Sequence, residues 1–165
     1  MQILVKNKYT LLYDEFKFKC SVGKRGITSK KIEGDLKTPR GSYNLGPVYY
    51  RKDRMSKPVT KLKIISLQKE MGWCDDVSSK YYNKLIKVNE KIRHEKLYRK
   101  SKNYDLLIPI NYNTSRPKKN KGSAIFMHIS QNNYSGTEGC IALKKDDLIY
   151  ILTKINIETK INISD

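Results

Sequence analysis

Short runs of apolar and β-branched residues alternate with polar turns along the first half of the chain. Runs of this length, bounded by turn residues, are typical of β-strands. We expect strands at residues 3–5, 9–13, 16–22, 42–45, 62–66 and 84–88. Because Asp14 and Glu15 form a tight connection between two of these runs, the chain is predicted to begin as a meander.

The second half adds further strands and one helix. Residues 104–110 predict a central strand, although Pro109 lacks an N–H group and favours a bulge or an edge position. Other strands are expected at residues 124–127, 140–143 and 160–163. From Lys144 the spacing becomes helical, with these apolar residues on one face: Leu148, Ile149, Ile151, Leu152 and Ile155. The pattern predicts a mainly β domain, a β-sandwich or barrel-like fold with one or two short helices.

The length and the cysteine content narrow the class of protein. The 165 residues predict a single domain over residues 1–165, large enough to bury a core without disulfides or metals. Cys20, Cys74 and Cys140 are widely spaced and contain no CxxC pair, which argues against a disulfide framework and a zinc site. We predict no metal and no cofactor, since His94 and His128 are the only imidazoles.

The formal net charge of +18 raises the question of nucleic-acid binding. The basic residues are spread along the chain, and their densest cluster, residues 116–121, is interpreted as a solvated loop. No helix-turn-helix, RNP or zinc-finger pattern is present. We therefore expect no nucleic-acid partner, and instead a field that attracts anionic ligands.

The N-terminal residues do not have the long apolar region and the cleavage site of a signal peptide. No run approaches the ~18–20 apolar residues that a membrane span requires. We expect no membrane span and a cytoplasmic location. The alternative is the periplasm or cell wall, if another route exports the chain.

Residues 122–143, GSAIFMHISQNNYSGTEGCIAL, carry the strongest chemical signal. They place His128 and Cys140 at the ends of two expected strands, joined by a polar loop that can fold back. An imidazole beside a thiol yields a reactive thiolate. The N–H groups of Gly139 and Cys140 are candidates for holding an oxyanion. On residue types alone, the catalytic interpretation is matched by an equal alternative, in which Cys140 is a buried structural cysteine and His128 an unrelated core histidine.

Several motifs in this sequence resemble those of one enzyme family. His128 followed by residues 135–141, SGTEGCI, resembles the signature of the YkuD family of L,D-transpeptidases, a histidine, a loop and then Ser/Thr-x-Gly-Cys-hydrophobic. Residues 33–46, EGDLKTPRGSYNLG, are similar to the family's G-D-x-x-T-P-x-G segment. Residues 72–76 and 94–99, GWCDD and HEKLYR, resemble a compact branch of the family. The motifs occur in the right order along nearly the whole chain.

This resemblance implies cysteine-dependent acyl transfer on peptidoglycan or muropeptide stem peptides. Cys140 would attack the carbonyl of the L-diaminopimelate–D-Ala bond, and His128 would take the thiol proton and return it to the leaving amine. Transfer of the thioester to an amine is transpeptidation, and transfer to water is L,D-carboxypeptidase activity.

Further residues are candidate contacts to the substrate: Trp73, Asp75, Asp76, His94, Arg99 and Glu138. The alternatives are a core tryptophan with acids that cap a turn, an ordinary surface histidine, and a Glu138 that orients His128. The loop before Cys140 is shorter than in common family members, Glu138 replaces a histidine, and Ala142 replaces a polar residue. These departures concern the acceptor side of the site.

Two other functions compete with a wall transpeptidase. Because no export signal is recognised, we rate a cytosolic hydrolase that releases D-Ala from recycled muropeptides equally with a wall transpeptidase. We favour hydrolysis as the main outcome. A non-enzymatic basic binding protein with the same fold is the alternative of a different class. Such a module would have no need of Cys140 and His128 within hydrogen-bond reach.

Overall fold

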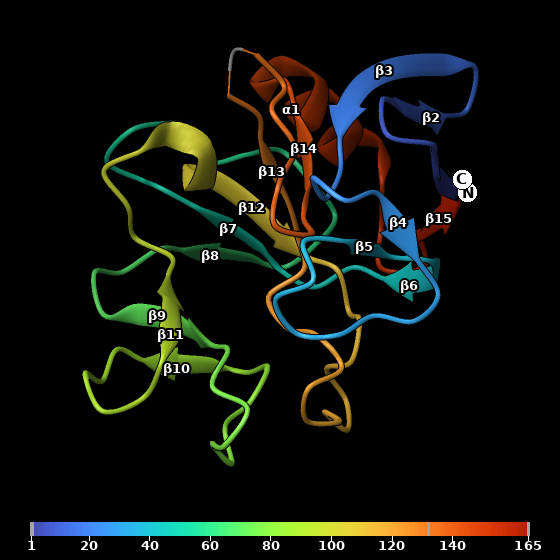
Figure 1. The fold of residues 1–165 in the computed structure, drawn as a ribbon. Helices are drawn as coiled ribbons and strands as arrows, with labels where there is room; N and C mark the ends of the chain where they lie inside the picture. Colours follow the sequence, from blue (N-terminus) through green and yellow to red (C-terminus); the bar gives the residue numbers. More distant parts are fainter. Residues whose placement is uncertain (1, 132, 165) are drawn as a thin grey trace.

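The structure is a computed structural model that describes residues 2–131 and 133–164. Its main feature is a curled sheet of ten strands (Figure 1). In spatial order these are β6 (Gly41–Asn44), β15 (Lys160–Ser164), β1 (Gln2–Lys6), β2 (Thr10–Tyr13), β3 (Phe16–Ser21), β14 (Ile141–Leu143), β13 (Phe126–Ile129), β12 (Leu106–Pro109), β7 (Val48–Tyr50) and β8 (Ile64–Ser66). An isolated β-bridge joins Leu45, just after β6, to Ile110, just after β12, so the edge of the sheet at β6 contacts the strand β12 on its opposite side.

The core lies inside this curl. Alternate residues of a strand point to opposite faces, and in β1 the side chains of Ile3 and Val5 are fully buried. The helix α1 (Lys145–Lys154) adds Leu148, Ile151 and Leu152 to the same core. Burial of these apolar groups is the main favourable term in folding.

A second, smaller sheet stands beside the large one, at the lower left of Figure 1. It consists of β10 (Leu85–Lys87), β9 (Met71–Cys74) and β11 (His94–Lys96). Trp73 of β9 packs edge-on against Phe126 of β13, with ring centroids 5.2 Å apart. A short 3-10 helix, η1 (Lys102–Tyr104), connects this region to β12. Two very short strands, β4 (Ile27–Thr28) and β5 (Thr38–Pro39), pair on the other side of the site.

The predicted fold class is confirmed, since the protein is mainly β with one α-helix. The expected strands are present, with ends shifted by up to two residues. The sequence pattern missed β7, β9 and β11, as well as the short pair β4 and β5. Pro109 does not mark an edge: β12 has β13 and β7 on its two sides, and the proline is its last residue. No helix in the described part of the chain has the length and apolarity to cross a bilayer.

Candidate active site

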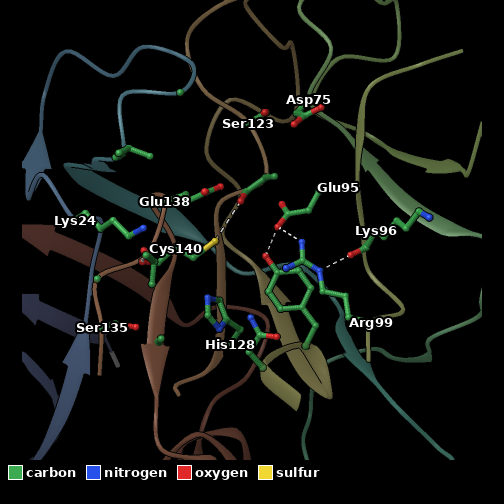
Figure 2. Close-up of a pocket in the computed structure, with 18 of the residues that line it drawn as sticks. Lys24, Asp75, Glu95, Lys96, Arg99, Ser123, His128, Ser135, Glu138 and Cys140 are labelled. Carbon is green, nitrogen blue, oxygen red and sulfur yellow. Dashed lines mark hydrogen bonds and ion pairs between the residues drawn. The ribbon is translucent and has the colours of Figure 1, made fainter. Parts of the chain in front are cut away.

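A cavity of about 800 Å³ opens where the two sheets approach each other (Figure 2). Residues of the small sheet, of the segment after β3 and of the loop before β14 contribute to its wall. Among the residues singled out from the sequence, those that line it are Cys140, His128, Asp75, His94, Arg99 and Glu138. The tertiary structure thus brings together residues that are up to 65 positions apart in the chain.

The register of two neighbouring strands places the sulfur and the imidazole. β13 and β14 are parallel, with His128 opposite Ala142. Cys140 stands just before β14, beside Phe126, whose backbone N–H donates to Sγ over 3.3 Å. Since residues two apart in a strand share a face, His128 lies on the same face as Phe126 and is turned toward the same cavity.

The Cys140 thiol is protonated in this site. Its Sγ donates to the carbonyl oxygen of Ala124 over 3.3 Å, and only 7% of the residue is exposed. Burial raises the pKa of Cys140 to about 12, and the Glu95 carboxylate acts in the same direction. The Phe126 N–H, the Tyr104 hydroxyl and Arg99 lower this pKa in part.

The His128 imidazole is neutral and is held through its Nδ1 atom. Nδ1 lies 2.9 Å from the carbonyl oxygen of Ile129. Because a carbonyl can only accept, we assign the ring proton to Nδ1, which leaves the lone pair on Nε2. Burial lowers the pKa of His128 to about 4. The two pKa shifts leave a neutral thiol and a neutral imidazole in the unliganded protein. Within the described residues no hydrogen bond joins His128 to Cys140.

A threonine fixes the backbone next to Cys140, the candidate nucleophile. The hydroxyl of Thr38 donates to the carbonyl of Gly139 over 2.8 Å and accepts from the N–H of Gly23 over 2.9 Å. Gly139 has φ +140°, and a Cβ there would stand 2.8 Å from the Lys37 carbonyl oxygen. Only glycine allows this close approach.

The two candidate oxyanion donors differ in availability. The N–H of Gly139 donates to Thr137 Oγ1 over 3.1 Å, and the same hydroxyl donates to the Cys140 carbonyl over 2.6 Å. The N–H of Cys140 has no protein acceptor in the part of the chain that the structure describes. It is therefore the donor that is free to meet a developing oxyanion.

Two of the sequence candidates lie away from the cavity wall. Trp73 is 8% exposed, and its Nε1 donates to Asn83 Oδ1 over 2.8 Å. Asp76 accepts from the Ser78 N–H over 2.9 Å and its hydroxyl over 2.6 Å, which shapes an exposed turn. Their proposed contacts to substrate stay predictions, for which the cavity wall offers no support.

The other candidates face the cavity with different partners. Asp75 pairs with Arg93, with 3.1 Å between Oδ1 and Nε. Nδ1 of His94 lies 2.6 Å from the Ile92 carbonyl oxygen. Glu138 is exposed at the mouth, and in the described structure it has no hydrogen bond to His128. Of the two roles considered for Glu138, contact with a substrate amine fits this position better.

Several cavity residues were not found from the sequence, and two of them contact each other. Glu95 and Tyr104 line the cavity and are joined by a hydrogen bond of 2.5 Å from the tyrosine hydroxyl to Oε1. Glu95 stands between His94 and Lys96 in a stretch rich in charged residues, so no local pattern singled it out. The described residues contain no cluster of three or more His, Cys, Asp or Glu side chains suited to a metal ion.

Comparison with known proteins bears on this arrangement. The family model YkuD, the L,D-transpeptidase catalytic domain, matches residues 3–163. A search of curated proteins and a search of solved structures found no match. The matched stretch covers nearly the whole chain and includes both His128 and Cys140, so the resemblance seen in the sequence motifs is confirmed.

Proposed function

Because this chain belongs to the L,D-transpeptidase (YkuD) family, we propose that it forms a Cys140 thioester with a stem peptide and passes the acyl group to an amine or to water. Membership in this family supports an L,D-transpeptidase-type enzyme that catalyses acyl transfer on peptidoglycan. One observation carries the proposal for its mechanism. Cys140 and His128 stand on adjoining parallel strands, on one face, at the wall of one cavity.

The first half-reaction starts from the neutral pair. Nε2 of His128 takes the Sγ proton as the sulfur attacks the carbonyl carbon of the L-diaminopimelate–D-Ala bond. The Cys140 N–H donates to the oxygen of the tetrahedral intermediate, an interaction that is typically worth about 3–4 kcal/mol. The imidazolium then returns the proton to the amine of D-Ala, which leaves, and the thioester forms.

The charged residues of the cavity suit the ends of such a substrate. The stem peptide carries carboxylates and the side-chain amine of diaminopimelate. Arg99 is placed to meet a carboxylate, and Glu138 and Asp75 are placed to meet an amine, since all three line the cavity that holds Cys140.

We further propose that water is the main acceptor, with release of D-Ala and with transpeptidation as a side activity. Support comes from the acceptor side, where Ala142 and Glu138 line the cavity in place of the residues common in the family. The proposed location is the cytoplasm, where soluble muropeptides would be the substrate. Recovery of the native protein in the envelope fraction would instead favour transpeptidation.

Product analysis tests the reaction. We expect that incubation with a disaccharide tetrapeptide yields tripeptide and D-Ala, and that an added D-amino acid is incorporated to a minor extent. Mass spectrometry distinguishes these products from crosslinked dimers. Dominant dimers would overturn hydrolysis, and binding of the tetrapeptide without any product would favour the non-enzymatic binding protein.

Substitution of the nucleophile tests the mechanism. Cys140→Ala should abolish turnover and the mass adduct with a carbapenem while the domain stays folded, because the thiol forms the covalent bond. Cys20→Ala is the matched control, since Cys20 is also buried and free but lies outside the cavity. Near-normal activity of Cys140→Ala on the tetrapeptide would show that the nucleophile is another group.

A further inference from the structure

One carboxylate ties the small sheet to the reacting side chains. Oε1 of Glu95, in β11, accepts hydrogen bonds of 2.5 Å from the Tyr104 hydroxyl and 2.5 Å from Arg99 Nη2. Arg99 follows β11, whereas Tyr104 ends η1 and leads into β12 of the large sheet. The dashed lines of Figure 2 show both bonds converging on Glu95. Charge-assisted bonds of this kind are short and strong.

Tyr104 carries this contact to the imidazole. The residue is 3% exposed, and its ring meets that of His128 edge-on, with centroids 5.2 Å apart. The Arg99 guanidinium stacks over the Tyr104 ring, 4.0 Å from its centroid. Arg99 is fixed in turn by the bond from its Nε to the Lys96 carbonyl over 2.7 Å. The phenol is thus held between the guanidinium and the imidazole.

The same groups act on the sulfur. The charge of Glu95 raises the pKa of the Cys140 thiol, while the hydroxyl of Tyr104 and the charge of Arg99 lower it. Other titratable groups line the same cavity: His128 of β13, Glu138 of the loop before β14, Lys24, Lys31 and Glu33 of the segment after β3, and Asp75, His94 and Lys96 of the small-sheet region. Burial raises the pKa of Glu95, against the effect of Arg99 and Tyr104, although 23% of its side chain is exposed.

We propose that Glu95 is a positioning residue of the acyl-transfer site, which holds the Tyr104 hydroxyl and the Arg99 guanidinium against the Cys140 sulfur and the His128 ring. This role rests on the proposed function. It follows that β11, and with it the small sheet, is part of the machinery that sets the reactivity of the nucleophile.

Two variants separate this role from a structural one. Glu95→Gln keeps an acceptor and the side-chain shape but removes the charge, so the thiol pKa should fall. Tyr104→Phe keeps the buried ring but removes the hydroxyl that favours the thiolate, so the thiol pKa should rise. A structural defect has no reason to move the two variants in opposite directions.

The readout is the rate at which iodoacetamide alkylates Cys140 at pH 8, measured on the Cys140 peptide by mass spectrometry. Below the thiol pKa the thiolate fraction sets the rate, and intrinsic nucleophilicity offsets part of the effect. The rate should therefore change roughly threefold for each pKa unit. We expect it to rise in Glu95→Gln and to fall in Tyr104→Phe. Glu90→Gln, at an exposed position of the same region, is the matched control.

Turnover of the tetrapeptide gives the second readout. Both variants should lower kcat by about tenfold or more, with KM changed much less, because each weakens the Glu95–Tyr104 bond that positions the groups beside Cys140 and His128. Equal alkylation rates in both variants and Glu90→Gln, or a shift of both variants in one direction, would overturn the inference. Wild-type protein that does not turn over the tetrapeptide would instead refute the proposed function, since alkylation needs no substrate.

Discussion

Burial decides the charge of Cys140 and His128, the two side chains proposed to react. A low-dielectric environment disfavours the charged form of any group, so it raises the pKa of Cys140 to about 12 and lowers that of His128 to about 4. The residue types alone suggested a preformed thiolate. In the proposed mechanism the charges arise only when the sulfur attacks the substrate, and the low dielectric of the buried site then strengthens the interactions that stabilise them.

The His128 pKa predicts a pH-dependent stability. An unfolded histidine, with a pKa of about 6.5, takes up a proton as the pH falls, whereas the folded one resists until about 4. The unfolded state therefore gains protons first between pH 6.5 and 4, and the folded state loses stability over that window. We expect wild type to lose about 3 kcal/mol more than His128→Asn between pH 7 and pH 4.

Urea unfolding at the two pH values measures this difference. His94→Asn is the control, since the exposed fraction of His94 is larger than that of His128. An equal loss of unfolding free energy in wild type and His128→Asn would contradict a neutral, buried His128.

At the scale of elements, one amide joins three segments around the site. Oδ1 of Asn83 accepts from Trp73 Nε1 of β9 over 2.8 Å and from the Ala124 N–H over 3.1 Å. Its Nδ2 donates to the carbonyls of Tyr112 and Asn113, over 3.0 and 2.7 Å. The carbonyl of Ala124 is the acceptor of the Cys140 thiol, so this link reaches the nucleophile.

Loss of the Asn83 side-chain amide should lower the stability of the protein. Asn83 is 2% exposed, so Asn83→Ala leaves buried donors and acceptors unpaired, and we expect it to lower the free energy of unfolding by about 2–4 kcal/mol. Asn89→Ala, which removes one exposed turn contact to the Lys91 N–H, should cost less than about 1 kcal/mol. Urea midpoints of the two variants compare them directly, and equal midpoints would show that Asn83 does not hold the segments together.

Two of the strands that the pattern missed, β9 and β11, lie in the small sheet. β9 and β11 belong to a three-stranded sheet, and β11 reads His-Glu-Lys, with no apolar alternation. A strand of this kind forms because a neighbouring strand pairs with it. In β11, His94 lies opposite Cys74 and Glu95 lies opposite Trp73 of β9. Apart from β7, the strands of the large sheet were predicted, because one face of each is buried in the core and the period of two shows in the sequence.

At the scale of the whole molecule, the net charge of +18 is an attractive field for anions. Substrate carboxylates should be drawn to the cavity, where Lys24, Lys96 and Arg99 contribute positive charge. Raising NaCl from about 50 to 500 mM shortens the screening length severalfold. We therefore expect the KM for the tetrapeptide to rise about threefold or more while kcat stays nearly constant.

The control for this effect is the same peptide with its carboxyl groups amidated. Its KM should depend only weakly on salt, because the field acts on the charge of the ligand. If both peptides respond equally, the salt acts on the protein's conformation and the field plays no part in substrate capture.

The sequence by itself determined the fold class and the family, and it singled out Cys140 and His128 as the proposed reacting pair. These rest on local signals: period-two burial, helical spacing before the last strand, and motifs around Thr38, His128 and Cys140. Only the tertiary structure decided how the motifs meet, with Thr38 holding Gly139 and with Glu95 and Tyr104 beside the sulfur. It also decided that Trp73 is packed inside and that both reacting groups are uncharged. The physical reason is that burial and long-range hydrogen bonds depend on which segments become neighbours, and no local pattern encodes that.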